Sequence, residues 1–380
     1  MGGIKMNKNY LILGCAGYIG SHLLERLLSR EDINITGWDI EVQKIKPYIN
    51  NPRLKFFQED ISKAIREPHF MEAFLSADAV IQLVGLCNPS TYNTEPLRVI
   101  HSNFIQLYPL IDLCAQHKKW IMHFSTSEVY GRTLSSYCGD EEYNLLDLYE
   151  LREQSTPLIM GPIKSQRWSY ACAKQLMERY IYGHHKTNGM PYTIVRPLNF
   201  FGSRMDYIPG YDGQGVPRVL ACFIAALFHR KPMQVVDGGT ARRTITSIDD
   251  AINAIELMLD NPAAAQNEIF NIGNRDNEVS MRELAEIMRT IYADITGDKT
   301  YLKHPIEYVT SNVFYGEGYE DSDRRFPQIS NAQQKLGWNP TIKLEDILRR
   351  TIQAYQLAYL VENKGKLLNS RNDKHVAGAA

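Results

Sequence analysis

The sequence predicts an α/β fold, in which a doubly wound parallel sheet is followed by a smaller C-terminal α/β domain. Short apolar runs alternate with stretches of helical apolar spacing through roughly the first 200 of its 380 residues. This alternation is typical of a parallel sheet with helices on both faces. The first run, 9–14, ends at a glycine and is followed by a helical pattern over 18–30.

Five further apolar runs continue the series of predicted strands. They cover residues 34–40, 54–61, 78–85, 120–131 and 192–202. Helical patterns lie between most of them, as crossover connections in a parallel sheet require. We therefore expect a sheet domain over 1–198, completed by segments near 235–275.

The pattern loosens after about residue 200, where we expect a second domain over 199–365. A Gly/Pro-rich segment leads into an apolar helix within 210–230, and a short strand follows at 233–239. A helix over 247–260 would be capped by Ser247 or Asp249. We interpret this half as a smaller domain that covers the carboxyl edge of the sheet. Residues 366–380 are expected to form a disordered tail.

Composition argues against several classes of function. Forty-two basic residues against forty-three acidic ones leave a net charge of −1, which disfavours a dedicated nucleic-acid surface. The six cysteines form no C-x-x-C pair and no regular framework, so we expect reduced thiols and no metal site. No apolar stretch is long enough to cross a membrane, and no cleavable leader is apparent. A cytoplasmic protein is the expectation.

A glycine-rich loop follows the first predicted strand. Gly14, Gly17 and Gly20 stand in "GCAGYIG" and open the first helix. The first glycine permits a tight turn, the second lets the backbone approach a pyrophosphate, and the third lets the helix pack on the strand. The spacing is G-x-x-G-x-x-G, which differs by one residue from the usual dinucleotide fingerprint.

An acidic residue at the end of the second strand strengthens the cofactor prediction. Asp39 lies 19 residues after Gly20, where a carboxylate accepts hydrogen bonds from an adenosine ribose. No arginine follows it to hold a 2′-phosphate, which favours NAD over NADP. The alternative is a structural turn with a capping acid. The cofactor contacts expected here are Gly14, Gly17, Tyr18, Ile19, Gly20, Asp39, Asp60 and Ile61.

A tyrosine and a lysine stand four residues apart in "RWSYACAKQ". Tyr170 and Lys174 lie one helical turn apart, so both side chains can reach one cleft. A nearby ammonium would lower the pKa of the phenol towards working pH. Thr126 ends the fifth strand, beside the expected nicotinamide, and could orient a substrate alcohol. The set suits oxidation of an alcohol, whereas an isolated pair would be an ordinary solvated helix surface.

These motifs together resemble the extended short-chain dehydrogenase/reductase family, the NAD-dependent epimerases and dehydratases. The resemblance runs from about residue 9 to 351 and implies a Rossmann domain, bound NAD and a nucleotide-sugar substrate. The resemblance implies that Tyr170 acts as the base, while Lys174 stabilises the phenolate and bonds the nicotinamide ribose. The resemblance also implies a homodimer formed through a four-helix bundle.

Within the family, "STSEVYG" resembles the UDP-glucuronate decarboxylases, with Ser127 followed by the acidic Glu128. A 4,6-dehydratase would more naturally carry an acidic pair there. The resemblance places Arg325, in "DSDRR", on the sugar acid, where it would hold the carboxylate or assist reprotonation. The alternative for Arg325 is a salt bridge to Asp321 or Asp323, and Arg324 is an ambiguous neighbour.

Several longer stretches resemble the UDP-apiose/UDP-xylose synthases of plants, in which two thiols lie at the site. Cys87, in "GLCNPSTYNTEP", matches one of them, but Ser127 stands where those enzymes carry the second. The alternative for Cys87 is a small buried apolar residue. Arg167 matches a site arginine expected to face the sugar, or else forms a surface ion pair. The product stays open between UDP-apiose with UDP-xylose, UDP-xylose alone, and a UDP-4-keto-pentose.

The resemblance also implies contacts for the UDP group. Asn199 and Arg243 match residues that bind the diphosphate, and a guanidinium suits phosphate through its two-pronged geometry. Tyr92 is expected near the sugar and Tyr315 near the nucleotide, with ordinary packing as the alternative for both. A dinucleotide-binding sensor is the non-enzymatic alternative, although a sensor has no need of Tyr170 and Lys174.

Overall fold

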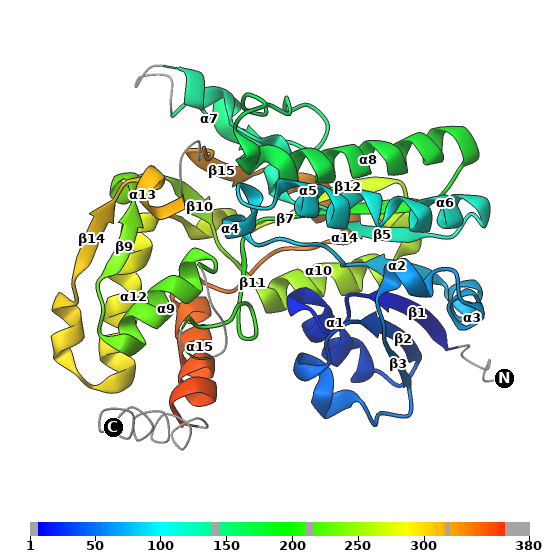
Figure 1. The fold of residues 1–380 in the computed structure, drawn as a ribbon, viewed down its shortest axis with the longest axis horizontal. Helices are drawn as coiled ribbons and strands as arrows, with labels where there is room; N and C mark the ends of the chain where they lie inside the picture. The colour runs from blue at the N-terminus through cyan, green and yellow to red at the C-terminus, as the bar shows by residue number, and fades with distance from the viewer. Residues whose placement is uncertain (1–6, 139–143, 210, 212–215, 316–319, 362–380) are drawn as a thin grey trace, which may run out of the picture.

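A computed structural model describes residues 7–138, 144–209, 211, 216–315 and 320–361 (Figure 1). A large sheet with helices on both faces forms one half of the molecule, and a helical unit with a small two-stranded sheet forms the other. The last fifteen residues, for which the sequence predicts a tail, lie outside the described part.

The central sheet contains seven strands, all parallel, in the order β12-β7-β5-β4-β1-β2-β3. Their bounds are Lys8–Leu13 (β1), Ile33–Asp39 (β2), Leu54–Gln58 (β3), Ala79–Gln82 (β4), Ile121–Phe124 (β5), Tyr192–Pro197 (β7) and Glu268–Ile272 (β12). The doubly wound parallel sheet predicted from the sequence is confirmed. Strand order reverses between β1 and β4, so ligands are expected at the carboxyl ends of these strands.

Two of the predicted strands end early because the chain turns within their apolar runs. The run 120–131 leaves the sheet after Phe124, and residues Ser127–Tyr130 form a 3₁₀ turn instead. The run 192–202 divides into β7 and a short strand β8, Phe200–Phe201, because Asn199 adopts a left-handed φ of 43°. Both interruptions bring polar side chains to the carboxyl edge of the sheet.

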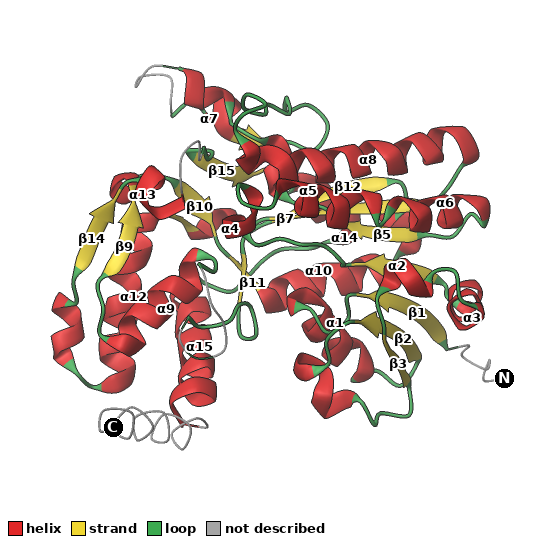
Figure 2. Ribbon diagram, in the orientation of Figure 1, coloured by secondary structure: helices red, strands yellow, loops and turns green. Residues whose placement is uncertain are grey.

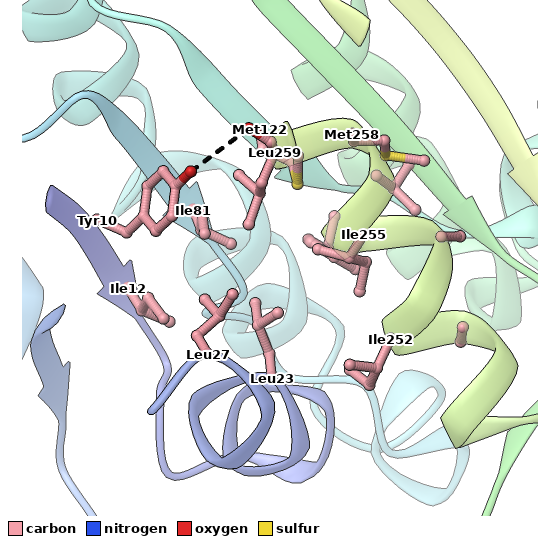
Figure 3. Packing of buried hydrophobic residues seen from close by; sticks show 14 of the residues in the cluster. Tyr10, Ile12, Leu23, Leu27, Ile81, Met122, Ile252, Ile255, Met258 and Leu259 are labelled. Carbon is pink, nitrogen blue, oxygen red and sulfur yellow. Dashed lines mark hydrogen bonds between the residues drawn. The ribbon is translucent and has the colours of Figure 1, made fainter. Parts of the chain in front are cut away.

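Helices cover both faces of the sheet (Figure 2). On one face lie α1 (Tyr18–Leu28), α10 (Ile248–Asp260) and α14 (Ser330–Leu336); on the other lie α2 (Ile61–Ala64), α3 (Pro68–Ser76), α6 (Tyr108–Gln116) and α8 (Ser169–Asn188). Figure 3 shows α1 and α10 packed on the first face, where the Tyr10 hydroxyl donates to the carbonyl of Leu259. Ser247 caps α10 through its side chain, as the sequence allows.

The second half has its own core. Helices α9 (Val219–His229), α12 (Met281–Thr296) and α15 (Leu344–Gln356) pack against the parallel strands β9 (Met233–Val236) and β14 (Ile306–Val309). The remaining short helices are α4 (Pro89–Tyr92), α5 (Pro96–Ile100), α7 (Leu146–Tyr149), α11 (Pro262–Ala265) and α13 (Ser311–Tyr315). Among the described residues, no helix combines the length and apolar character needed to cross a membrane.

A four-stranded sheet lies where the two halves meet. Its order is β13-β10-β15-β6, with bounds Glu278–Ser280 (β13), Arg242–Thr244 (β10), Arg324–Pro327 (β15) and Glu150–Leu151 (β6). Strand β10 runs antiparallel to β13 and parallel to β15. A further short strand, β11 (Thr246–Ser247), pairs with β8. These pairings carry residues from four distant parts of the chain to the carboxyl edge of the central sheet.

Candidate active site

The glycine-rich turn between β1 and α1 is too crowded for side chains at two of its three glycines. Gly14 has a φ of 84°, and a Cβ there would lie 3.0 Å from the backbone of Leu83. A Cβ on Gly20 would lie 2.2 Å from the carbonyl oxygen of Gly14. Gly17 caps α1, and a Cβ there would lie 3.2 Å from the carbonyl oxygen of Gly14. The glycine-rich turn and the amino end of α1 suit a diphosphate.

The acidic residues expected beside this turn are held by backbone amides. Asp39 accepts from the amides of Ala16 (2.8 Å) and Glu41 (3.0 Å), and burial raises its pKa. Asp60 caps α2 by accepting from the amide of Ser62 at 2.9 Å. Tyr18 and Ile19 lie in the first turn of α1, and Ile61 opens α2. The loop and Asp39 together fit a dinucleotide.

Tyr170 and Lys174 are both buried on the first turns of α8, where Lys174 Nζ donates to the carbonyl of Phe124 at 2.9 Å. Burial lowers the pKa of Lys174 to about 8. Burial also raises the pKa of Tyr170 well above its ordinary value, and Cys87 and Glu128 add to this rise. Removal of water from the phenol therefore dominates in the protein alone, and the net shift is opposite to the lowering expected from a nearby ammonium.

Thr126 and Tyr92 both lie close to Tyr170. The side chain of Thr126 opposes the rise of the phenol's pKa. The ring of Tyr92 is stacked on that of Tyr170, with centroids 4.8 Å apart, and is itself only 1% exposed. Tyr92 is thus packed against Tyr170, and its expected contact with the sugar stays a prediction. Cys87 is exposed in the loop between β4 and α4.

A cluster of buried charges lies next to this pair. Glu128, in the turn after β5, accepts from Arg167 at 2.6 Å and lies 3.6 Å from Arg325. Burial by itself would raise the pKa of Glu128, but the two guanidinium groups hold it below its ordinary value. Arg167 therefore forms a buried ion pair in the site, and the surface-pair alternative is wrong.

Asp321 joins three arginines of the same cluster. It lies 2.6 Å from Arg325, 2.8 Å from Arg243 and 3.5 Å from Arg167. Burial favours its neutral form, but these three charges outweigh burial and hold the pKa of Asp321 far below its usual range. The salt bridge considered as an alternative for Arg325 thus exists, and it lies inside the site. Three arginines and two carboxylates leave one positive charge.

The cluster borders a cavity of about 310 Å³ between the two halves of the molecule. Its polar lining comprises Glu128, Arg167, Asn199, Arg218, Gln234, Asp237, Thr240, Arg243, Asp321, Ser322, Asp323 and Arg325. Its apolar lining includes Phe201, Phe223, Val235 and Phe314, and Cys222 also lines it. Arg325 Nε is buried and has no hydrogen-bond partner among the described residues. Guanidinium groups at a cavity wall suit an anionic ligand.

The structure places the remaining predicted residues as follows. Asn199 lines the cavity and donates its side-chain amide to the carbonyl of Thr244 at 2.9 Å. Ser127 is 3% exposed at the start of the turn after β5. Tyr315 ends α13, but its side chain lies outside the described part of the chain.

A family model described as "NAD dependent epimerase/dehydratase family" matches residues 10–273, which include the glycine-rich turn, Tyr170 and Lys174. The chain belongs to this family. The match ends at the carboxyl end of β12, so Arg325 and Asp321 lie beyond it.

Among related epimerase/dehydratase family proteins, the UDP-D-apiose/UDP-D-xylose synthase of Oryza sativa subsp. japonica is 43% identical over 359 residues, covering 92% of this chain and 89% of the rice protein. UDP-D-apiose/UDP-D-xylose synthase 1 of Arabidopsis thaliana is also 43% identical, and the match covers 92% of this chain and 91% of the Arabidopsis protein. The crystal structure of PbgP3 from Burkholderia pseudomallei has a TM-score of 0.76 at 32% identity, covering 92% and 96%. UDP-glucuronic acid 4-epimerase from Bacillus cereus, at 22% identity (92% and 100% covered) and TM-score 0.73, shares the fold.

Sequence reasoning missed two charged residues of this family member. Asp321 entered only as a competing partner of Arg325, and its contact with three arginines depends on the β10–β15 pairing. Arg218 was overlooked at the start of α9, where it lines the cavity and binds Asp206 through two contacts of 2.9 Å. Arg218 follows the Gly/Pro-rich segment and caps an apolar helix, and this position in the sequence could have indicated it as a site residue.

Proposed function

We propose that this protein is an NAD-dependent enzyme that decarboxylates UDP-glucuronate through a UDP-4-keto sugar, giving UDP-apiose and UDP-xylose. The observation that carries the proposal is the position of the Tyr170–Lys174 pair beside a buried, net-positive cluster that contains Arg325. The pair serves oxidation of an alcohol, and the cluster suits an acidic sugar. The names of the rice and Arabidopsis relatives support the same substrate class.

NAD is the cofactor we propose. Gly14, Gly17 and the amino end of α1 would hold the diphosphate, and Asp39 would accept from the adenosine ribose. Lys174 would bond the nicotinamide ribose. When bound, NAD accepts a hydride from a substrate alcohol and can return it to a carbonyl. The other roles in the reaction are proposed for side chains of the protein.

Tyr170 is proposed to take the proton of the C4 hydroxyl. Burial raises the pKa of the phenol in the protein alone. Lys174 holds a positive charge on the same helix face, and the hydroxyl of Thr126 donates to the phenol oxygen as negative charge develops there. These two groups favour the phenolate against the effect of burial.

Arg325 is proposed to hold the sugar carboxylate. Oxidation at C4 gives a β-keto acid, which loses CO₂ because the electron pair left on C5 is delocalised as an enolate. The single excess positive charge of the cluster matches the single charge of the carboxylate before this loss. Glu128 and Arg167 are proposed to place a proton donor at C5, where the enolate is reprotonated.

The UDP group is proposed to occupy the rest of the cavity. Arg243 and Asn199 would contact the diphosphate, and Arg218 adds a third donor on the same wall. Arg243 is bound to Asp321 in the protein alone, so diphosphate binding would change the partners of this carboxylate. The contacts proposed for Tyr92 and Tyr315 with the sugar and nucleotide remain to be tested.

Ser127 favours a second candidate, a simple decarboxylase that releases UDP-xylose or a UDP-4-keto-pentose. Ring contraction to apiose breaks and remakes a carbon–carbon bond after CO₂ is lost, and Cys87 is the thiol proposed to assist this step. Incubation with UDP-glucuronate and NAD, followed by proton NMR of the sugar, separates the candidates. Branched-sugar signals, or those of a cyclic phosphodiester breakdown product, support apiose formation. Xylose or keto-pentose signals alone support the simpler reaction.

We also propose a cytoplasmic homodimer, formed through α6 and α8. Ile105, Tyr108 and Leu176 expose between 40% and 49% of their surface on these helices or beside them, which supports burial against a second copy. Light scattering on the eluting protein should give twice the chain mass. A monomer at micromolar concentration would contradict this assembly.

A further inference from the structure

Strands β10 and β15 each carry two consecutive arginines, and their register sets these arginines side by side. Arg242 is the partner of Arg324, and Arg243 is the partner of Arg325. Because side chains alternate between the two faces of a strand, one pair faces the cavity and the other faces away from it. Arg243 and Arg325 share Asp321 on the cavity side.

The two arginines on the other face share a different carboxylate, Glu278 of β13. Arg324 binds it through two short contacts, Nε to Oε1 at 2.6 Å and Nη2 to Oε2 at 2.7 Å. Arg242 lies 3.3 Å from Oε2 of the same group. The guanidinium of Arg324 also lies 3.7 Å from the ring centre of Tyr149. The side chains of Arg324 and Glu278 are each 12% exposed, so solvent screens this pair only weakly.

We propose that Glu278 is a positioning residue that holds Arg325 in the active site through its ion pair with Arg324. Strand β15 is four residues long and has two register partners on each neighbouring strand, so backbone pairing alone gives it little support. A slip of one residue would turn Arg325 away from the cavity. The pair between Glu278 and Arg324 opposes that slip, and Glu278 also offsets the repulsion between Arg242 and Arg324.

The role of Arg325 towards a sugar acid rests on the proposed function, but the position of β15 can be measured without any ligand. Hydrogen exchange of a peptide spanning 320–328 reports on β15, and a peptide from β1 reports on the central sheet. In the Glu278→Gln variant, we expect exchange in 320–328 to become about tenfold faster, with exchange in β1 unchanged. Equal acceleration in both peptides would mean general destabilisation and would overturn the proposal.

Ligand affinity supplies the functional measurement. Glu278→Gln should raise the dissociation constant of UDP-glucuronate about tenfold, as expected for loss of one well-placed charged contact, and leave that of UDP within about twofold. UDP binding should change little for two reasons. UDP lacks the sugar acid, and its proposed contact Arg243 lies on β10, which is held by pairing with β13 over three residues. Equal weakening of both ligands would contradict a specific effect on Arg325.

Two further variants complete the design. Glu286→Gln on α12 makes the same charge change at an exposed residue and should behave as the wild type in both measurements. Arg324→Lys keeps the charge but loses the two-pronged contact, so its effects should have the same direction as those of Glu278→Gln. Arg324→Lys replaces Glu278→Gln if the Glu278→Gln protein does not fold. If the wild type binds no UDP-glucuronate, the proposed function fails, whereas the exchange measurement still decides the role of Glu278. If exchange in 320–328 is as slow in Glu278→Gln as in the Glu286→Gln control, the positioning role of Glu278 is overturned.

Discussion

The rings of Tyr92 and Tyr170 lie face to face, with centroids 4.8 Å apart and planes 10° from parallel. The guanidinium of Arg167 lies 5.3 Å from the ring centre of Tyr92. Tyr92 therefore connects the proposed proton-transfer residue to the charge cluster around Glu128. Because α4 ends at Tyr92 and α8 begins one residue before Tyr170, this stack joins two segments far apart in sequence.

Replacement of Tyr92 by leucine should lower kcat at least tenfold. The variant loses the flat surface against which the Tyr170 ring is fixed, and small displacements of a reacting group are costly. Tyr92→Phe keeps the ring and should retain most of the activity if the residue acts by stacking. Steady-state kinetics of the three proteins test this. A Tyr92→Phe variant as impaired as Tyr92→Leu would instead assign the role to the hydroxyl.

Tyr170→Phe should abolish turnover and leave NAD binding intact. The substitution removes the proton acceptor but keeps the ring that stacks on Tyr92. Calorimetric titration with NAD measures binding, and product formation from UDP-glucuronate measures turnover. Full activity in this variant would disprove the assignment of Tyr170 as the base.

The activity should fall as the pH rises above about 8. Burial lowers the pKa of Lys174 to about 8, so the ammonium that supports the Tyr170 phenolate is lost above this value. The profile of kcat/KM against pH reports this ionisation in the free enzyme. A profile that stays flat to pH 9.5 would contradict this role for Lys174.

Loss of activity from this ionisation should be separate from unfolding. In the unfolded chain Lys174 returns to its ordinary pKa, so between about pH 8 and 10 the unfolded state binds more protons than the folded state at this residue. This residue therefore makes the folded state relatively more stable as the pH rises through that window. Thermal unfolding of wild type and Lys174→Met across this range measures the difference, and a contribution of the opposite sign would show that Lys174 is not desolvated.

Ser127→Cys should increase the share of apiose among the products. The substitution places a second thiol in the turn after β5, at a position where the serine is 3% exposed, and it changes side-chain volume little. Proton NMR of the product mixture gives the ratio of branched to unbranched sugar. An unchanged ratio would mean that residue 127 does not control ring contraction.

The parts of the site built from one continuous segment could be predicted from the sequence. Gly14, Gly17 and Gly20 lie on a single turn, and the spacing of Tyr170 and Lys174 follows from helix geometry. Each of these depends on neighbours within a few residues, so the local pattern was sufficient.

The parts that depend on pairing between distant strands could not be predicted in the same way. Asp321 meets Arg243 only because β15 pairs with β10 in one register, and Arg324 faces Glu278 for the same reason. The direction of the Tyr170 pKa shift also failed as a prediction, since it depends on how much protein surrounds the phenol. Charge spacing alone contains no measure of burial.

The most direct test of the central claim is release of labelled CO₂ from UDP-glucuronate that carries ¹³C in its carboxyl group, with NAD present. We predict that the wild-type protein releases ¹³CO₂ and that Tyr170→Phe releases none, since loss of the carboxylate requires prior oxidation at C4. Absence of ¹³CO₂ with the wild-type protein, or equal release by the variant, would contradict the account.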